Sequence, residues 1–189
     1  EGTRGRDPAP GSLEGRSVVA TFGGSTTYDI GAGEGDTWSD RLGEALGLDR
    51  TFVVNHGVPG YTTVEHLVQT AFYQVKFGKL PRCAIYYVGW NDLRNAHIPD
   101  LDPAYADFHL PSQVDSLKVR RIGGSHVTIS PLLTMLARVV SANVDTVRYF
   151  SDPYGREPVS GSDPALEALY ERNIRSISAI NRDRGIATI

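Results

Sequence analysis

The sequence predicts an α/β fold in which helices cover both faces of a parallel sheet. Three runs of apolar, β-branched or aromatic residues, at 17–22, 51–55 and 83–88, are typical of strands buried on both faces. Helical patterns separate these runs, and alternating strands and helices with right-handed crossovers produce a doubly wound sheet. With 189 residues, 40% of them hydrophobic, the chain is long enough for one domain with an ordinary core.

The first helix is predicted between the first two strands. Asp36 can cap its N-terminus, and Gly47 marks its end because glycine readily adopts the backbone conformation that closes a helix. The 3.6-residue period predicts that this helix packs on the sheet through Trp38, Leu42, Ala45 and Leu46.

The second helix is predicted to start at a capping box. Thr62 and Glu65 are three residues apart, so each side chain can bond the backbone N–H of the other residue. Gly78 is the predicted terminator of this helix. Its inward face is predicted to consist of Val64, Leu67, Val68, Ala71, Phe72 and Val75.

The alternation of strands and helices is interrupted after the third strand. Residues 95–162 are rich in Pro, Asp, Ser and Gly, and they contain one helix candidate at about 132–140. This segment is therefore predicted to be an insertion or lid within a single domain that spans 1–189.

A long helix and a fourth strand are predicted after this insertion. Asp163 followed by Pro164 is typical of a helix start, and Gly185 is typical of a helix end. The apolar run 186–189 is the predicted strand. The apolar face of the helix is predicted to comprise Leu166, Leu169, Tyr170, Ile174, Ile177 and Ile180.

Composition argues against two classes of partner. A formal net charge of -3 and a pI near 5.9 do not suit a basic face for nucleic acid or anionic lipid. No apolar run approaches the roughly 18–20 residues that span a bilayer.

The sequence opens at Glu1 with a polar, Gly/Pro-rich stretch typical of a processed terminus, which favours an extracytoplasmic location over a cytoplasmic one.

The loops after the first three strands are where a ligand is expected, because the crevice of a doubly wound sheet lies beyond the carboxyl ends of its strands. The first loop contains Gly23, Gly24 and Ser25 directly after its strand. The two glycines permit a tight turn that presents the serine hydroxyl at the crevice, as a nucleophile requires. A turn or helix-cap serine is the structural alternative for this loop taken alone.

The second and third loops contain hydrogen-bond donors. Gly60, on the loop 55–63, has no side chain, so its backbone N–H can approach a ligand oxygen near a helix N-terminus. Asn91 follows the third strand within 89–92, and its amide can donate to an oxyanion. A Pro-Gly turn and an Asx turn are the structural alternatives for these loops. Together the three loops can supply a nucleophile, a backbone donor and an amide donor.

On these residues the sequence resembles the SGNH, or GDSL-like, serine hydrolases. Residues 23–25 correspond to the first motif, usually Gly-Asp-Ser, Gly60 matches the glycine of the second, and 89–92 match the third, Gly-x-Asn-Asp. The resemblance covers about 18–94 well and 164–189 in outline. It implies a three-layer α/β/α fold with the flavodoxin-like strand order 2-1-3-4-5.

The resemblance also implies a serine-dependent carboxylic ester hydrolase, an acyl or acetyl esterase that works through an acyl-serine and needs no cofactor. Ser25 is then the nucleophile. Its own N–H, the Gly60 N–H and the Asn91 side-chain amide are the implied donors to the oxyanion, and a small-molecule ester is the implied partner. Gly24 departs from the usual aspartate of the family, which we expect to alter the support of the turn more than its chemistry.

The fourth motif of the family, an aspartate three positions before a histidine, is absent, since no histidine here has an aspartate at that spacing. We therefore expect the catalytic histidine and aspartate beyond Ile189, in further sequence or a complementary C-terminal fragment. His97 is the local substitute if that expectation fails. His66 is predicted to lie on the helix surface. The remaining histidines are His56, His109 and His126.

Two further functions stay open on the sequence. An acyltransferase would pass the acyl group of the same acyl-serine to an alcohol or sugar, and a non-catalytic binding module would retain the oxyanion pocket without a base. A nucleotide site is disfavoured, because Asp36 stands where the dinucleotide fingerprint needs a glycine after 31–35, and a P-loop lysine is missing. No cluster of His, Cys, Asp and Glu has the ligand spacing of a metal site such as zinc.

Overall fold

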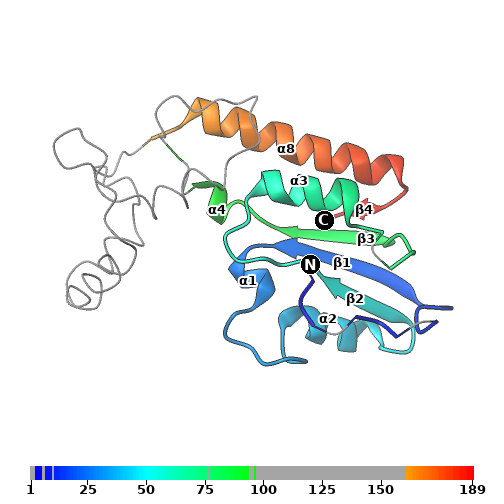
Figure 1. The fold of residues 1–189 in the computed structure, drawn as a ribbon. Helices are drawn as coiled ribbons and strands as arrows, with labels where there is room; N and C mark the ends of the chain where they lie inside the picture. The colour runs from blue at the N-terminus through cyan, green and yellow to red at the C-terminus, as the bar shows by residue number, and fades with distance from the viewer. Residues whose placement is uncertain (1–2, 6, 10, 76, 94–95, 97–160) are drawn as a thin grey trace, which may run out of the picture. The chain divides into compact units, whose positions relative to one another are not determined.

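A four-stranded parallel sheet forms the centre of the fold (Figure 1). The structure is a computed structural model that describes residues 3–5, 7–9, 11–75, 77–93, 96 and 161–189. The strands are β1 (Ser17–Gly23), β2 (Thr51–Asn55), β3 (Cys83–Tyr87) and β4 (Ala187–Thr188). Their order across the sheet is β2-β1-β3-β4, which confirms the predicted doubly wound sheet and matches the first four positions of the order 2-1-3-4-5.

The parallel register brings the carboxyl ends of three strands to one edge of the sheet. Thr21 in β1 is opposite Asn55 in β2, and Gly23, the last residue of β1, is opposite Tyr87 in β3. The loops that follow β1, β2 and β3 therefore begin side by side, although they are far apart in the sequence.

One face of the sheet carries a column of stacked rings. Phe22 is fully buried and lies between His56 and Tyr86, with ring centroids 4.7 Å apart on each side and nearly parallel planes. Such stacking adds to the stability that burial of the ring area provides. The other buried members of this core cluster are Ala20, Ala84 and Ile186.

Helices cover both faces of this sheet, which gives the three layers that the resemblance implies. In Figure 1, α2 (Trp38–Leu46) lies on one face, and α3 (Thr63–Phe72) and α8 (Pro164–Asp183) lie side by side on the other. Two short helices that the sequence did not predict, α1 (Ser25–Tyr28) and α4 (Trp90–Leu93), begin within three residues of the ends of β1 and β3.

The capping box predicted for α3 is present. The Thr62 side chain accepts a hydrogen bond from the Val64 N–H at 3.3 Å, and Glu65 accepts one from the Thr62 N–H at 2.8 Å. The helix ends at Phe72 rather than near Gly78.

The buried face of α3 differs from the prediction. Among the predicted inward residues, Val68, Phe72 and Val75 are exposed, and Val64 is fully buried. The α3 residues that are buried are Thr63, Val64, His66, Gln69 and Thr70. The helix is therefore rotated so that its polar side faces the interior.

Polar groups on and after α8 explain this rotation. Asn181 accepts a hydrogen bond from Gln74 at 2.8 Å and donates one to the Tyr86 hydroxyl at 3.1 Å. Arg184 donates to main-chain carbonyl oxygens near the end of α3, including that of Thr70. Within α3 itself, Gln69 donates to the His56 carbonyl oxygen at 3.1 Å, and the Thr70 hydroxyl is 2.7 Å from the Tyr86 hydroxyl, so burying these polar side chains costs little.

The predicted start of α8 agrees with the structure, and its predicted apolar face agrees in part, since Tyr170, Ile174 and Ile180 are only half-buried. Asp163 accepts hydrogen bonds from the first N–H groups of the helix, and Pro164 occupies its first position. The helix ends two residues before Gly185, whose φ of 69° lies in the left-handed region. Its fully buried residues are Leu166, Leu169, Asn173, Ile177 and Asn181.

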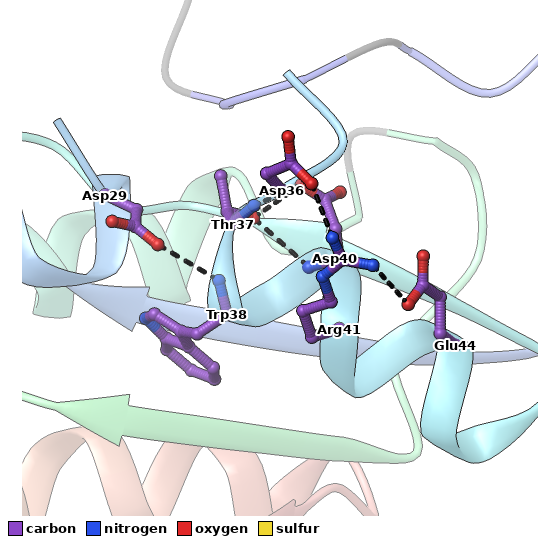
Figure 2. Close-up of polar contacts among 7 residues, drawn as sticks. All are labelled: Asp29, Asp36, Thr37, Trp38, Asp40, Arg41 and Glu44. Atoms are coloured by element: carbon purple, nitrogen blue, oxygen red, sulfur yellow. Dashed lines mark hydrogen bonds and ion pairs between the residues drawn. The ribbon is translucent and has the colours of Figure 1, made fainter. Parts of the chain in front are cut away.

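The cap of α2 lies one residue later than predicted. Thr37, not Asp36, accepts a hydrogen bond from the Asp40 N–H, at 3.1 Å, and Asp40 accepts one from the Thr37 N–H at 3.0 Å (Figure 2). Asp36 instead pairs with Arg41 on the exposed surface. The shift follows from chemistry, because only the threonine has a partner that completes a capping box.

The buried face of α2 also differs from the prediction. Its two buried residues are the small Ser39 and Gly43, and Leu46 is 41% exposed. A side chain on Gly43 would bring its Cβ within 3.4 Å of Val53 in β2. The small residues allow a close approach of helix to sheet, which the hydrophobic period could not reveal.

The predicted helix at 132–140 and nearly all of the predicted insertion at 95–162 lie outside the described residues.

Candidate functional site

The first loop forms the tight turn that its glycines predict. A Cβ on Gly23 would lie 2.1 Å from the Thr27 hydroxyl oxygen and 2.5 Å from the Tyr87 carbonyl oxygen, so no side chain fits there. Gly24 follows as the N-cap of α1, and Ser25 is the first residue of that helix. Ser25 is half-buried, which leaves part of it open to solvent at the carboxyl edge of the sheet.

The Asn91 amide packs against the glycine that precedes Ser25. A Cβ on Gly24 would lie 2.5 Å from Asn91 Nδ2. The expectation that glycine at this position changes the support of the turn thus has a physical basis, since Asn91 occupies the space that a side chain would need. Ser25 and Asn91, from the loops after β1 and β3, line the same small cavity.

The orientation of the Asn91 side chain is fixed by the second loop. Its Nδ2 atom donates to the Tyr61 carbonyl oxygen at 2.8 Å. An amide nitrogen carries two hydrogens, so one N–H can still be offered to a ligand. This assignment places the amide nitrogen, rather than its oxygen, toward Gly24.

Gly60 lies on a turn that is attached to the first loop. The Val58 N–H donates to the Gly23 carbonyl oxygen at 2.9 Å, and the Tyr61 N–H donates to the Val58 oxygen at 3.2 Å. Gly60 has a φ of 85°, in the left-handed region that glycine adopts without steric cost. The second loop is therefore held against the first, and its turn requires the left-handed backbone conformation of Gly60.

A small cavity of about 20 Å³ lies at the junction of the first and third loops. Ser25 and Asn91 line it, and Tyr61, the neighbour of Gly60, contributes to its wall, whereas Gly60 itself does not line it. Its outer rim includes Tyr87 and Trp90, which are 64% and 78% exposed. The residues that line this cavity carry no charge.

A larger cavity of about 220 Å³ lies between α2 and β2, away from these loops. Its wall includes Arg16, Asp40 and Phe52, and none of the predicted site residues. Size alone would favour this cavity, but it lacks a candidate nucleophile with oxyanion donors beside it. The smaller cavity is the better candidate site.

The two described histidines have structural roles. The His56 ring stacks on Phe22 in the core, and His66 is fully buried, with its Nδ1 atom 2.9 Å from Gln69 Oε1. The prediction that His66 lies on the surface is wrong, because α3 buries its polar side. In the described part of the chain, no histidine is hydrogen-bonded to the Ser25 hydroxyl. The other three histidines, His97, His109 and His126, lie outside the described residues.

Burial changes the protonation of His66. The surrounding protein lowers its pKa to about 4 by desolvation, although the hydrogen bond with Gln69 opposes the shift. Its Nε2 atom is buried without a hydrogen-bond partner among the described residues. At neutral pH the ring is therefore neutral.

The sequence reasoning missed one group of residues next to the site. Asp92, Thr63 and Asn173 are almost fully buried and are hydrogen-bonded to one another. Asp92 could have been singled out as the last residue of the third motif. Asn173 lies on α8, far away in sequence, and no local signal marks it.

Two kinds of feature are absent from the described residues. None of their helices combines the length and the apolar character that crossing a bilayer requires. Within the same residues, no group of three or more His, Cys, Asp and Glu side chains is placed to hold a metal ion.

No protein-family model matches the sequence, and no curated protein sequence matches it. Among solved structures, the chain is similar to AlinE4, an SGNH-hydrolase family esterase, at 20% identity, with 87% of this chain and 96% of that chain covered and a TM-score of 0.39. It is similar to TesA at 17% identity, with 88% and 99% covered and a TM-score of 0.38. A variant of Axe2, an acetyl xylan esterase from Geobacillus stearothermophilus, is 16% identical, with 92% and 75% covered and a TM-score of 0.37.

Proposed function

We propose that this protein is a serine-dependent hydrolase of carboxylic esters. The observation that carries the proposal is the position of Asn91 Nδ2 against Gly24, directly before Ser25, at the carboxyl edge of a parallel sheet. A hydroxyl group can attack a carbonyl carbon, and an amide donor can stabilise the oxyanion that results. In this chain both groups line one small cavity.

In the proposed reaction the Ser25 oxygen attacks the carbonyl carbon of the ester, and its proton passes to a base. The carbonyl oxygen becomes an oxyanion that accepts hydrogen bonds from the Ser25 N–H, the Gly60 N–H and the Asn91 amide. Collapse of this intermediate expels the alcohol, which takes up a proton, and leaves an acyl-serine. Water then attacks the acyl-serine, releases the carboxylic acid and restores Ser25.

The base must be a group other than the described histidines. His56 and His66 are both buried in structural contacts, and the low pKa of His66 would make it a weak proton acceptor. The proposal therefore assigns the base to a histidine outside the described residues. His97 is the candidate within this sequence, a few residues after Asn91.

A fluorophosphonate probe tests the nucleophile. We expect the probe to modify Ser25, located by mass spectrometry of the labelled peptide, and Ser25→Ala to abolish both labelling and esterase activity. Ser178→Ala, on α8, is the matched control and should retain both. Labelling at another residue, or full activity in Ser25→Ala, would refute the proposal.

The fate of the acyl group separates hydrolysis from the alternatives. With a p-nitrophenyl acetate substrate, a hydrolase releases acetate, whereas an acyltransferase transfers the acetyl group to an added alcohol or sugar. A non-catalytic binding module would release no nitrophenol above the level of Ser25→Ala. We expect acetate as the main product.

A further inference from the structure

Three buried polar side chains meet beside the loops that carry Gly60 and Asn91. Asp92 of α4 accepts hydrogen bonds from the Thr63 N–H at 3.1 Å and from the Thr63 hydroxyl at 2.5 Å. Asn173 of α8 donates to the same hydroxyl at 3.0 Å. Asp92 is 2% exposed, and Thr63 and Asn173 are 0% exposed. The contacts join α3, α4 and α8 at one point.

The hydrogen bonds of this group run in one direction, from a cation to a carboxylate. The Arg172 guanidinium donates to Asn173 Oδ1 at 2.9 Å, and Asn173 in turn donates to Thr63. The Thr63 hydroxyl has one proton, so donating it to Asp92 leaves a lone pair for the Asn173 amide. Each side chain is thus held in one orientation by partners on both sides.

Stability alone is a weak reason for a buried carboxylate at this place. Burial raises the pKa of the Asp92 carboxyl, although the hydrogen bonds from Thr63 oppose the rise. An apolar side chain of similar volume often gives equal or greater stability than a buried charge. The position of Asp92, between two loops of the candidate site, points to a different role.

The adjacent residues Asn91 and Asp92 hold the second loop at two places. Asn91 binds the Tyr61 carbonyl oxygen at 2.8 Å, and Asp92 binds Thr63, two residues further along. The Val58–Gly23 hydrogen bond holds the start of this loop, and the contacts of Asn91 and Asp92 hold its end. Two attachments fix its orientation, and with it the peptide of Gly60, which directly precedes Tyr61.

We infer that Asp92, Thr63 and Asn173 form a positioning cluster that holds the Gly60 N–H in a fixed place relative to the Asn91 amide. The catalytic consequence of this inference rests on the proposed function. None of the three residues is assigned contact with the substrate. They act through the two donors, whose separation must match one oxyanion.

Thr63→Val and Thr70→Val are a matched pair of variants. Both threonines are fully buried on α3, and each hydroxyl bonds another side chain, in the case of Thr70 the Tyr86 hydroxyl at 2.7 Å. Thr70 lies about two turns further from the loops. We expect both variants to lose similar thermal stability. Only Thr63→Val should speed hydrogen exchange of the backbone N–H groups of Gly60 and Asn91 in the full chain, by about tenfold or more. The reason is that this variant loosens the loop locally.

Kinetics on a short-chain ester give a second measurement. Thr63→Val should lower kcat by about 10- to 100-fold with a smaller change in KM, because misplaced donors lose transition-state stabilisation. Thr63→Ser keeps the hydroxyl and should restore kcat, and Thr70→Val should retain it. If Thr63→Val does not fold, Asn173→Ala replaces it, since that change removes the same hydroxyl's second partner.

Unchanged exchange at Gly60 and Asn91 in Thr63→Val, or equal acceleration in Thr70→Val, would overturn the inference whatever the activity. Failure of the proposed function is a different result, namely a wild-type chain that the fluorophosphonate probe does not label at Ser25. In that case the exchange measurement still decides whether the cluster positions the loop.

Discussion

The Asn91 amide nitrogen occupies the space that a side chain on Gly24 would fill, since an added Cβ would lie 2.5 Å from it. The φ of Gly24 is -80°, so a substitution there adds no left-handed strain, and its main effect is on Asn91. Gly24→Ala should therefore push the amide away from Ser25 and lower kcat for a short-chain ester by about 10- to 100-fold.

Gly31→Ala is the control for that change, because a Cβ at Gly31 meets nothing within 4 Å. It should leave kcat unchanged, and thermal unfolding of both variants should show that each is folded. A Gly24→Ala protein with wild-type kcat would contradict the role given to the Asn91 amide.

Removal of the amide itself should have a larger effect. Asn91→Ala is expected to lower kcat by about 100- to 1,000-fold with a smaller change in KM, as loss of one oxyanion donor does in other acyl-transfer sites. The Tyr61 carbonyl oxygen also loses its partner, at a cost of about 1 kcal/mol in the free energy of unfolding, measurable in urea.

Asn91→Asp keeps the size of the side chain but replaces a donor by a negative charge. It should reduce kcat at least as strongly as Asn91→Ala. An effect confined to KM in either variant would assign Asn91 to ground-state binding instead.

His66 should make the protein sensitive to acid. Its pKa is lowered from 6.5 to about 4 by burial, so between these two values the unfolded chain binds more protons than the folded one. The contribution of His66 to the free energy of unfolding is therefore constant above pH 6.5 and falls as the pH drops toward 4, by up to roughly 3 kcal/mol.

His66→Asn tests this, because an amide can replace the ring Nδ1 as partner of Gln69 and does not titrate. Urea unfolding at pH 7 and at pH 4.5 should show a smaller loss of stability on acidification in the variant. Equal losses in the two proteins would mean that other groups carry the acid sensitivity.

The loop between α1 and α2 is held by Asp29. Its side chain accepts a hydrogen bond from the Trp38 N–H at 3.1 Å (Figure 2). Its φ is 61°. Asp29→Ala loses the bond and keeps the left-handed backbone, so it should reduce the free energy of unfolding by about 1–2 kcal/mol.

Asp29→Asn retains an acceptor and should remain close to wild type, since asparagine tolerates this backbone region. Asp29→Gly loses the hydrogen bond, but glycine adopts this backbone conformation without strain. Its free energy of unfolding should therefore lie between those of the alanine and asparagine variants. Equal stability of the alanine and asparagine variants in urea would show that the hydrogen bond to Trp38 contributes nothing.

Local signals were enough to predict the strands and the start of two helices. Residues 51–55 contain three β-branched side chains and one aromatic ring, which favour a strand. The Thr62–Glu65 box and the Asp163-Pro164 pair are chemical start signals that need no tertiary partner. The formation of this strand and of these two helix starts could therefore be predicted without knowledge of the rest of the fold.

Buried faces were predicted poorly where polar groups pair across helices. Gln69 and Thr70 look like surface residues until His66, Tyr86 and the groups of α8 are placed around them. The hydrophobic period assumes that apolar side chains face inward, so it assigned the wrong side of α3. Asn173 was missed at the site for the same reason, because the hydrophobic period places a polar helix residue on the surface.

The candidate site also has a consequence for folding. Ser25 lies two residues after β1, and Asn91 lies on the loop after β3, which pairs with β1 in a single parallel register. A folding intermediate in which only β1 and β2 have joined would contain the proposed nucleophile and lack its proposed amide donor. Probe reactivity would then appear only when β3 has docked, so active-site titration during refolding would count the molecules that have reached native strand topology.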